Sequence, residues 1–265
     1  MSELIQIIHH PNQIVEVALN RPDKRNAMSF DLLRELLKTG ELLKKQRDIR
    51  VVILTGEGSS FSAGIDLGDL QSPKNSLVAM WELTRPGPNL FQQVFLVWRD
   101  LPVPVIAAIH GHCFGAGMQF ALGADFRIAT PDAQLAIMEA RWGLVPDMAA
   151  TVTLRGLVGL DVAKELTMTA RIVNGTDAKA IGLISHVSDD PFGKALELAA
   201  ELTTRSPDAV LAAKRVLNAM VSESESATLA LEKKWQRRLL LGKNFRIAGK
   251  RAKSPELGFV EREYD

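Results

Sequence analysis

Residues 105–125, VIAAIHGHCFGAGMQFALGAD, join a strand-like segment to a helix-like segment through a glycine-rich turn. The apolar run from Val105 to Ile109 is typical of a strand, and the run from Met118 to Leu122 is compatible with a helix. The turn between them contains Gly111, Gly115 and Gly117. Where a helix begins after such a turn, backbone N–H groups are unpaired and lie at the positive end of the helix dipole. The stretch therefore predicts a site for an anion or an oxyanion.

Composition restricts the class of protein. The chain has 265 residues, of which 46% are hydrophobic and 24% are charged, values typical of a soluble globular protein with one large domain, or one domain and an appendage. A formal net charge of +1 gives no field that would favour nucleic acid or a membrane surface. Cys113 is the single cysteine, which excludes an intramolecular disulfide and a cysteine-based zinc site. No apolar run approaches the ~18 residues of a membrane span, and residues 1–10 lack a signal-peptide pattern, so we expect a cytoplasmic protein.

The order of the predicted elements indicates strands alternating with helices, followed by a helical region. Strand-like segments are expected at residues 4–9, 13–19, 51–54, 105–109, 126–129, 133–138 and 184–187. Helical patterns are expected at residues 30–46 (with Ser29 as N-cap), 65–71, 90–99, 151–158, 162–170, 175–183, 195–204, 209–220 and 227–241. Residues 73–89 contain three prolines and no regular pattern, and predict a mobile segment over a site. We expect an α/β core over residues 1–195 and a helical region over residues 196–265.

Two loops of small residues occupy equivalent places in this order. Residues 61–67 (FSAGIDL) and residues 113–117 (CFGAG) each follow an apolar strand candidate and precede a helix candidate. If the two strands are neighbours in one sheet, one N–H group from each loop can point at the same oxygen atom. The alternative is a pair of ordinary tight turns, which spacing alone favours, since such turns are common.

Two carboxylates follow the next predicted strand. Glu139 comes directly after the apolar run 135–138, and Asp147 lies eight residues further on. A carboxylate at the end of a buried strand is partly desolvated, which raises its pKa and suits it to act as a general base. The alternative, which residue statistics favour, is a solvated glutamate or an ion pair with Arg141.

Other chemical motifs are absent or incomplete. The glycines of the central stretch do not form G-x-G-x-x-G, and neither a P-loop nor a G-x-S-x-G nucleophile motif occurs. His110 and His112 have strand spacing but no third ligand nearby, so we expect no metal site. The basic residues between Lys243 and Lys253 favour a solvated helix face over a site for phosphate or RNA.

Five segments together resemble the crotonase superfamily, also called the enoyl-CoA hydratase/isomerase family. They are NRPDKRNAM (20–28), FSAGIDL (61–67), AAIHGHCFGAGMQFALGADFRIA (107–129), AIMEARWGLVPD (136–147) and NGTDAKAIGL (174–183). The likeness covers about residues 4–190. It implies a crotonase-like α/β spiral of ββα units, with a helical C-terminal region used in trimerisation. It also implies homotrimers, or dimers of trimers, that bind acyl-CoA thioesters without a further cofactor, since coenzyme A is part of the substrate.

The resemblance assigns roles by position. It implies an oxyanion hole made by the backbone N–H groups of Ile65 and Ala116, the latter where glycine is frequent. The two glutamates of hydratases fall on Glu139 and on Gln119, and glutamine can orient water but cannot accept a proton as a carboxylate does. Asp147 falls where some dienoyl-CoA isomerases carry an acid. The other implied substrate contacts are Lys24 and Arg25 with the CoA phosphates, Ala63, Asp66 and Leu67 along the adenine end, and Gly64 and Gly115 in the two loops; Gly68 replaces a lysine of some hydratases.

These roles favour a one-base shift of a double bond. Glu139 would take a proton from C2 of a 3-enoyl-CoA and return it at C4, and Asp147 would act as a second acid or tune Glu139. The alternative is hydration of a 2-enoyl-CoA, with Glu139 activating a water molecule that Gln119 positions. A third hypothesis is a non-catalytic acyl-CoA-binding or RNA-binding protein, suggested by the missing carboxylate at position 119 and the C-terminal basic residues.

Overall fold

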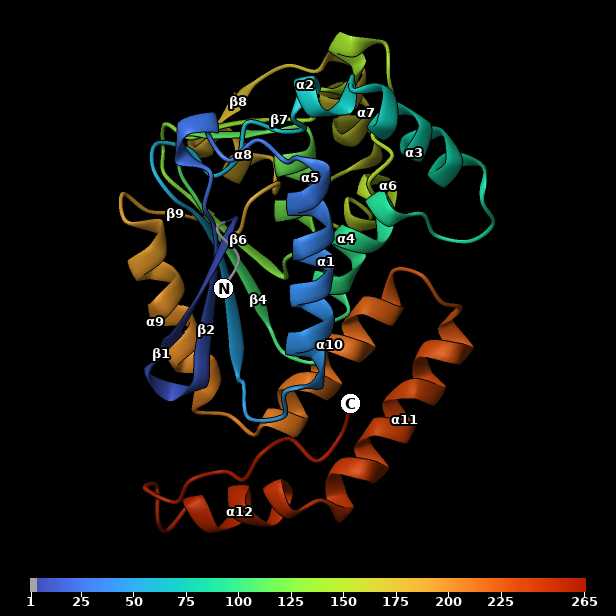
Figure 1. The fold of residues 1–265 in the computed structure, drawn as a ribbon. Coiled ribbons are helices and arrows are strands. Elements are labelled where there is room, and N and C mark those ends of the chain that lie inside the picture. Colours follow the sequence, from blue (N-terminus) through green and yellow to red (C-terminus); the bar gives the residue numbers. More distant parts are fainter. Residues whose placement is uncertain (1–3) are drawn as a thin grey trace.

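The computed structural model describes residues 4–265. Residues 1–3, which belong to the predicted core and to the N-terminal segment without a signal-peptide pattern, lie outside the described residues. A six-stranded sheet in the order β1-β2-β3-β4-β6-β9 forms the centre (Figure 1). Its first two strands pair antiparallel, and the others pair parallel. The strands are β1 (Ile5–His10), β2 (Ile14–Leu19), β3 (Val51–Gly56), β4 (Val105–Ile109), β6 (Phe126–Ala129) and β9 (His186–Val187).

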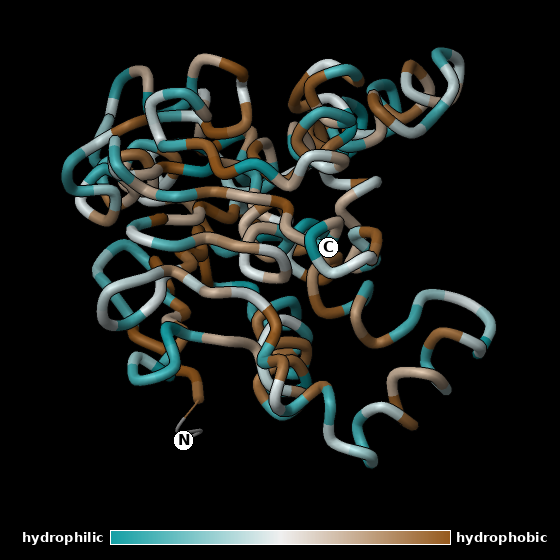
Figure 2. Tube along the Cα trace, turned by 90° about the horizontal axis from the view of Figure 1, so that it is seen from above, coloured by the Kyte–Doolittle hydropathy of each residue, from teal (hydrophilic) through white to brown (hydrophobic). Residues whose placement is uncertain are grey.

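The central strands are apolar throughout because both faces of the sheet are covered. In β3, Val52 and Leu54 pack into the core under α1 (Phe30–Lys45) and α4 (Leu90–Arg99). Val51 and Ile53 point to the opposite face, into a cluster with α9 (Pro191–Thr203). Figure 1 shows α1 and α9 on opposite sides of the sheet. The helix tubes alternate between hydrophobic and hydrophilic residues, as expected for helices with one buried face (Figure 2).

A small second sheet lies beyond the end of β4 and brings the central glycine-rich stretch next to the Glu139 segment. It consists of β5 (His112–Phe114), β7 (Gln134–Ala136) and β8 (Val173–Asn174). β5 lies inside the segment predicted as a turn, and α5 (Ala116–Leu122) begins two residues before the predicted helix. β5 and β8 are too short, at three and two residues, to show a strand periodicity in the sequence.

The prediction of an irregular segment at residues 73–89 is wrong for most of its length. Residues Pro73–Thr84 form α3, with Ser72 as N-cap and Pro73 at the first helical position, where proline is favoured. The other two prolines lie in the loop that follows. This loop is anchored because the buried Glu82 carboxylate accepts hydrogen bonds from Arg85 Nε at 2.6 Å and from Leu90 N at 2.7 Å. The segment does lie over a cavity, as described below.

Most of the remaining predicted helices are confirmed, with changed bounds. The N-cap prediction is correct, since Ser29 Oγ accepts a hydrogen bond from Leu32 N at 3.2 Å. The remaining helices of the core are α2 (Leu67–Leu70), α6 (Ala150–Thr153), α7 (Leu160–Thr169) and α8 (Gly175–Ala180), with 3-10 turns η1 (Pro11–Gln13), η2 (Pro22–Lys24) and η3 (Glu139–Trp142). None of the helices formed by residues 4–265 is both long enough and apolar enough to cross a lipid bilayer.

The C-terminal helices form a separate layer at one end of the sheet (Figure 1). They are α10 (Pro207–Met220), α11 (Glu225–Leu241) and α12 (Lys243–Arg251). The first two share a small core around Leu211 and Trp235. The boundary predicted between residues 195 and 196 falls inside α9, which packs on the sheet. The division into a core and a helical region remains a proposal, and this packing favours placing it after Thr203.

A buried ion pair fastens the C-terminal helices to the core. Lys214 Nζ in α10 lies 2.7 Å from Asp125 Oδ2 and donates to Val103 O at 2.8 Å. Lys214→Met would leave the Asp125 carboxylate without its cation, and we expect a loss of about 3–5 kcal/mol in the free energy of unfolding. Denaturant unfolding measures this loss, and Asp125→Asn combined with Lys214→Met should recover part of it. A loss below about 1 kcal/mol would contradict the structural role.

Candidate active site

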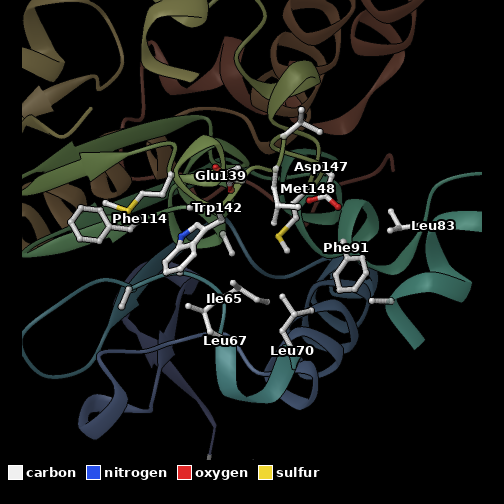
Figure 3. Close-up of a pocket in the computed structure, with 18 residues that line it drawn as sticks. Ile65, Leu67, Leu70, Leu83, Phe91, Phe114, Glu139, Trp142, Asp147 and Met148 are labelled. Carbon is white, nitrogen blue, oxygen red and sulfur yellow. The ribbon is translucent and has the colours of Figure 1, made fainter. Parts of the chain in front are cut away.

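A cavity of about 490 Å³ lies where the two small-residue loops, the Glu139 segment and α3 meet (Figure 3). Eight of the predicted site residues line it: Ala63, Gly64, Ile65, Leu67, Gly115, Ala116, Glu139 and Asp147. The remaining lining residues are Leu70, Ala79, Leu83, Phe91, Phe114, Met138, Trp142, Leu144, Val145 and Met148. Four of the predicted residues, Lys24, Arg25, Asp66 and Gln119, do not line it.

The two loops meet because their strands are neighbours. β3 and β4 pair parallel, and past their ends Ser62 and Cys113 form one further bridge. Ser62 N donates to His112 O at 2.9 Å, and Phe114 N donates to Ser62 O at 3.0 Å. Gly64 has a φ of +100°, and a Cβ atom there would lie 2.9 Å from Phe114 O. Only glycine fits this approach, so the loops are more than two independent tight turns.

Two N–H groups at this meeting point are unpaired. Within residues 4–265, neither Ile65 N nor Ala116 N donates to a protein acceptor. Ala116 is the first residue of α5, where no preceding turn supplies a carbonyl group. The residues on either side of Ile65 are both hydrogen-bonded to Met28: Gly64 O accepts from Met28 N, and Asp66 N donates to Met28 O. Both unpaired residues line the cavity, which makes them available to a ligand oxygen.

Glu139 places a carboxylate next to these loops. It begins the 3-10 turn η3 and does not end a strand, since β7 stops at Ala136. Its Oε1 accepts a hydrogen bond from Gln119 Nε2 at 2.6 Å, while its Oε2 is buried without a hydrogen-bond partner in the described part of the chain. Burial raises the pKa of Glu139, the bond from Gln119 opposes this, and the charge of Asp147 adds to it. The predicted alternative, an ion pair with Arg141, is not formed, because Arg141 Nε donates to Ala170 O.

Gln119 lies behind Glu139 and does not face the cavity. Its side chain is fully buried, and its Oε1 accepts hydrogen bonds from Met148 N at 3.0 Å and Ala150 N at 3.3 Å. The structure therefore places Gln119 outside the cavity lining, and its contact with substrate or with a water molecule stays a prediction. An amide suits this place because it donates to the carboxylate and accepts from two N–H groups at once, which a glutamate could not do. Gln119 thus holds the Glu139 carboxylate in place and anchors the backbone just after Asp147 through Met148 N and Ala150 N.

Asp147 is the second ionisable group of the cavity. It is half-buried, and burial raises its pKa above the ordinary value. Figure 3 shows the Glu139 and Asp147 carboxylates on the same wall, with Asp147 closer to Phe91 and Leu83. The cavity therefore offers two carboxylates at different depths, surrounded by apolar side chains.

Three of the predicted CoA contacts lie outside the cavity. The Asp66 carboxylate accepts from both Nη atoms of Arg21 at 3.1 Å and from Asp69 N at 3.3 Å, so it caps α2. Lys24 and Arg25 are exposed on the loop that carries η2. They are close to the first small-residue loop, since Ala63 N donates to Arg25 O at 2.8 Å. Their role in binding CoA phosphates remains a prediction.

Most of the apolar residues that form the cavity wall were not among the site residues predicted from the sequence. Leu83 and Phe91 lie between residues 80 and 95, where no periodicity marks which residues face inward. The C-terminal helices supply no lining residue in the part of the chain described here. No group of three or more metal-ligating side chains occurs among residues 4–265. His110 and His112 are engaged by Gly58 O and Ser60 Oγ.

The raised pKa of Glu139 has a consequence for stability. Because the folded state favours the neutral form, ionisation destabilises the fold as the pH rises from the usual pKa of 4.5 through the raised value. Glu139→Gln keeps an oxygen for Gln119 and removes this cost. We expect its Tm to exceed that of the wild type at pH 7, with the difference disappearing below about pH 4. Thermal unfolding across this range tests the expectation, and a lower Tm at pH 7 would contradict it.

Comparison with known proteins gives consistent results. A sequence model of the Enoyl-CoA hydratase/isomerase family matches residues 9–262. The chain is 35% identical over 239 residues to rat mitochondrial Delta(3,5)-Delta(2,4)-dienoyl-CoA isomerase, covering 87% of this chain and 72% of that protein. It is 34% identical over 226 residues to mouse mitochondrial methylglutaconyl-CoA hydratase, covering 83% and 70%. The structure superimposes on enoyl-CoA hydratase from Bacillus anthracis with a TM-score of 0.90 and 29% identity, covering 98% of this chain and 100% of that one.

Proposed function

Because the chain belongs to the enoyl-CoA hydratase/isomerase family of enzymes, we propose that it moves a carbon–carbon double bond along the acyl chain of a CoA thioester. The fold predicted from the sequence, a crotonase-like α/β spiral, is the one shared with the Bacillus anthracis hydratase. The observation that supports isomerisation most strongly is the Glu139 carboxylate. One of its oxygens accepts a hydrogen bond from Gln119, and the other is buried without a hydrogen-bond partner in the described part of the chain.

The proposed first step forms an enolate. The thioester oxygen accepts hydrogen bonds from Ile65 N and Ala116 N, which both lie in the cavity lining and have no acceptor among residues 4–265. Glu139 Oε2 removes a proton from C2, and the electron pair of the C–H bond moves into the enolate. Both N–H groups bind more strongly to the negative oxygen than to the carbonyl, so they lower the barrier. The raised pKa of Glu139 makes its carboxylate a stronger base.

The second step returns a proton further along the chain. With a 3-enoyl-CoA, Glu139 itself delivers the proton to C4 and leaves a 2-enoyl-CoA. With a 3,5-dienoyl-CoA, as in the reaction for which the rat relative is named, the charge spreads to C6. Asp147 lies further along the cavity wall, and its raised pKa favours a form that donates a proton there. We propose this second role for Asp147.

Hydration is less well supported by the same geometry. A hydratase needs a group that positions water against Glu139, and Gln119 does not line the cavity: its Nε2 donates to Glu139, and its Oε1 accepts from Met148 N and Ala150 N. The hydratase name of the mouse relative keeps this reaction among the outcomes to be tested. The non-catalytic hypothesis loses its main support, because Gln119 serves the neighbouring Glu139 and does not replace a cavity carboxylate.

A substrate comparison tests the proposal. Purified protein is assayed with 3-hexenoyl-CoA, with 3,5-octadienoyl-CoA and with crotonyl-CoA. We expect isomerisation of the first two to exceed hydration of crotonyl-CoA in kcat/KM. Faster hydration of crotonyl-CoA, lost in Glu139→Gln, would support the hydratase alternative and contradict the isomerase.

Asp147→Asn separates the one-base from the two-base reaction. We expect turnover of 3,5-octadienoyl-CoA to fall on the order of 10²-fold, the lower range for a general acid, and turnover of 3-hexenoyl-CoA to fall less than tenfold. Asp132→Asn, an exposed carboxylate outside the cavity, is the matched control. Equal losses with both substrates would contradict the second role of Asp147.

The assembly and location remain predictions. The homotrimer, or dimer of trimers, implied by the family resemblance can be measured by sedimentation. We expect a cytoplasmic protein from the sequence, while the two mammalian relatives are mitochondrial by name.

A further inference from the structure

The cavity continues past both carboxylates into an apolar end. Figure 3 shows it running from Phe114 and Leu67, beside the two small-residue loops, past Glu139 to Phe91 and Leu83. The far end lies between α3 and α4, with Ala79 also in its wall. A thioester held at Ile65 N and Ala116 N therefore directs its acyl tail toward this end.

The lining offers no positive charge. Glu139 and Asp147 are its only ionisable residues, and no lysine, arginine or histidine of residues 4–265 lines it. The two arginines that border the wall in sequence are bound elsewhere. Arg141 donates to Ala170 O at 3.2 Å, and Arg85 donates to Glu82 at 2.6 Å and to Pro88 O at 2.9 Å.

A second carboxylate on the acyl tail would be disfavoured for two reasons. Beside the buried Phe91 ring it would lose part of its water without gaining a cation, which is costly for a charge. It would also add negative charge to a cavity in which Glu139 has to be ionised to act as the base. The cavity would therefore disfavour an acyl tail that ends in a carboxylate, because its charge stays unpaired, and would accept an uncharged tail of similar length.

We infer that the substrate carries an uncharged hydrocarbon tail longer than crotonyl, which packs against Ala79, Leu83 and Phe91, and that acyl-CoAs with a second carboxylate are rejected. The inference rests on the proposed function only in that an acyl-CoA occupies this cavity with its thioester at the two loops. The expected substrate therefore differs from the one in the name of the mouse relative, because methylglutaconyl-CoA is the monothioester of a dicarboxylic acid.

Binding of saturated acyl-CoAs tests the inference independently of catalysis, because these ligands have no double bond to move. Isothermal titration would compare butyryl-, hexanoyl- and octanoyl-CoA with the wild-type protein. We expect affinity to rise at least twofold per added methylene, and about fourfold if each is fully buried. Hexanoyl-CoA should bind at least tenfold more tightly than adipoyl-CoA, which has the same number of acyl carbons and a terminal carboxylate. A smaller gain per methylene, or a smaller ratio, would overturn the inference even if the protein is an isomerase.

A charge introduced at the end wall tests its position. Leu83→Arg places a guanidinium beside the expected tail, on a side chain that is 55% exposed and tolerant of change. Leu77→Arg is the matched control, since Leu77 lies on the same helix, is 74% exposed and does not line the cavity. We expect Leu83→Arg to raise the affinity for adipoyl-CoA relative to hexanoyl-CoA at least tenfold, and Leu77→Arg to leave the ratio unchanged. An equal shift in both variants, or none in Leu83→Arg, would overturn the placement of the tail.

Discussion

We expect Glu139→Gln to lower kcat for 3-hexenoyl-CoA by about 10²–10⁴-fold, the range typical of the removal of a general base. The glutamine keeps the shape of the side chain and an oxygen for the bond from Gln119 Nε2, so the cavity should remain intact. What is lost is the negative Oε2, which has no hydrogen-bond partner among residues 4–265 and is therefore free to take the C2 proton.

Binding measurements separate this loss from a loss of affinity. The Kd for saturated hexanoyl-CoA should stay within about threefold of the wild-type value, because uniform binding does not need the base. An exposed carboxylate changed in the same way, Asp132→Asn, should leave both quantities unchanged. Wild-type kcat in Glu139→Gln would show that another group removes the proton.

Ala116→Pro has the second largest expected effect, a fall of about 10²–10³-fold in kcat. Ala116 is the first residue of α5, the helical position where proline is best tolerated, so the substitution removes one N–H group with little cost to the helix. The lost hydrogen bond is worth most when the thioester oxygen carries the enolate charge, so kcat should fall more than ligand affinity.

Ala116→Gly is the control for this substitution. It keeps the N–H group and removes only a methyl group, and we expect kcat within about tenfold of the wild type. A proline variant that folds, as judged by circular dichroism, and retains more than a tenth of wild-type kcat would argue against Ala116 N as an oxyanion donor.

The fold could be predicted from the sequence where local signals and tertiary packing agree. β3 and β4 are continuous apolar runs because both of their faces are buried, and the Ser29 cap marks the start of α1. The helix α3 could not be recognised in this way. Its exposed apolar residues include Leu77 and Trp81, so the usual contrast between a buried and a polar face is missing.

The site was predictable to the extent that it depends on backbone. The glycines of the two loops require close approach, and that approach leaves the N–H groups of Ile65 and Ala116 unpaired. The place of the Gln119 side chain could not be predicted, because sequence position relates it to a catalytic carboxylate, whereas the structure shows it buried and bonded to Glu139. The direction of a side chain on a seven-residue helix depends on what packs around it, and no sequence pattern carries that information.

The most direct test of the proposed mechanism is the identity of the product formed from 3-hexenoyl-CoA by the wild-type protein and by Glu139→Gln, established by chromatographic separation from the substrate together with the mass. Isomerisation conserves mass, while hydration adds one water molecule. We predict that the wild type converts 3-hexenoyl-CoA to 2-hexenoyl-CoA of unchanged mass, and that Glu139→Gln forms this product at least 10²-fold more slowly. Unchanged 3-hexenoyl-CoA after incubation with the wild type, as a hydratase of 2-enoyl-CoA alone would leave it, or isomerisation at the wild-type rate in Glu139→Gln, would contradict the proposed role of this carboxylate.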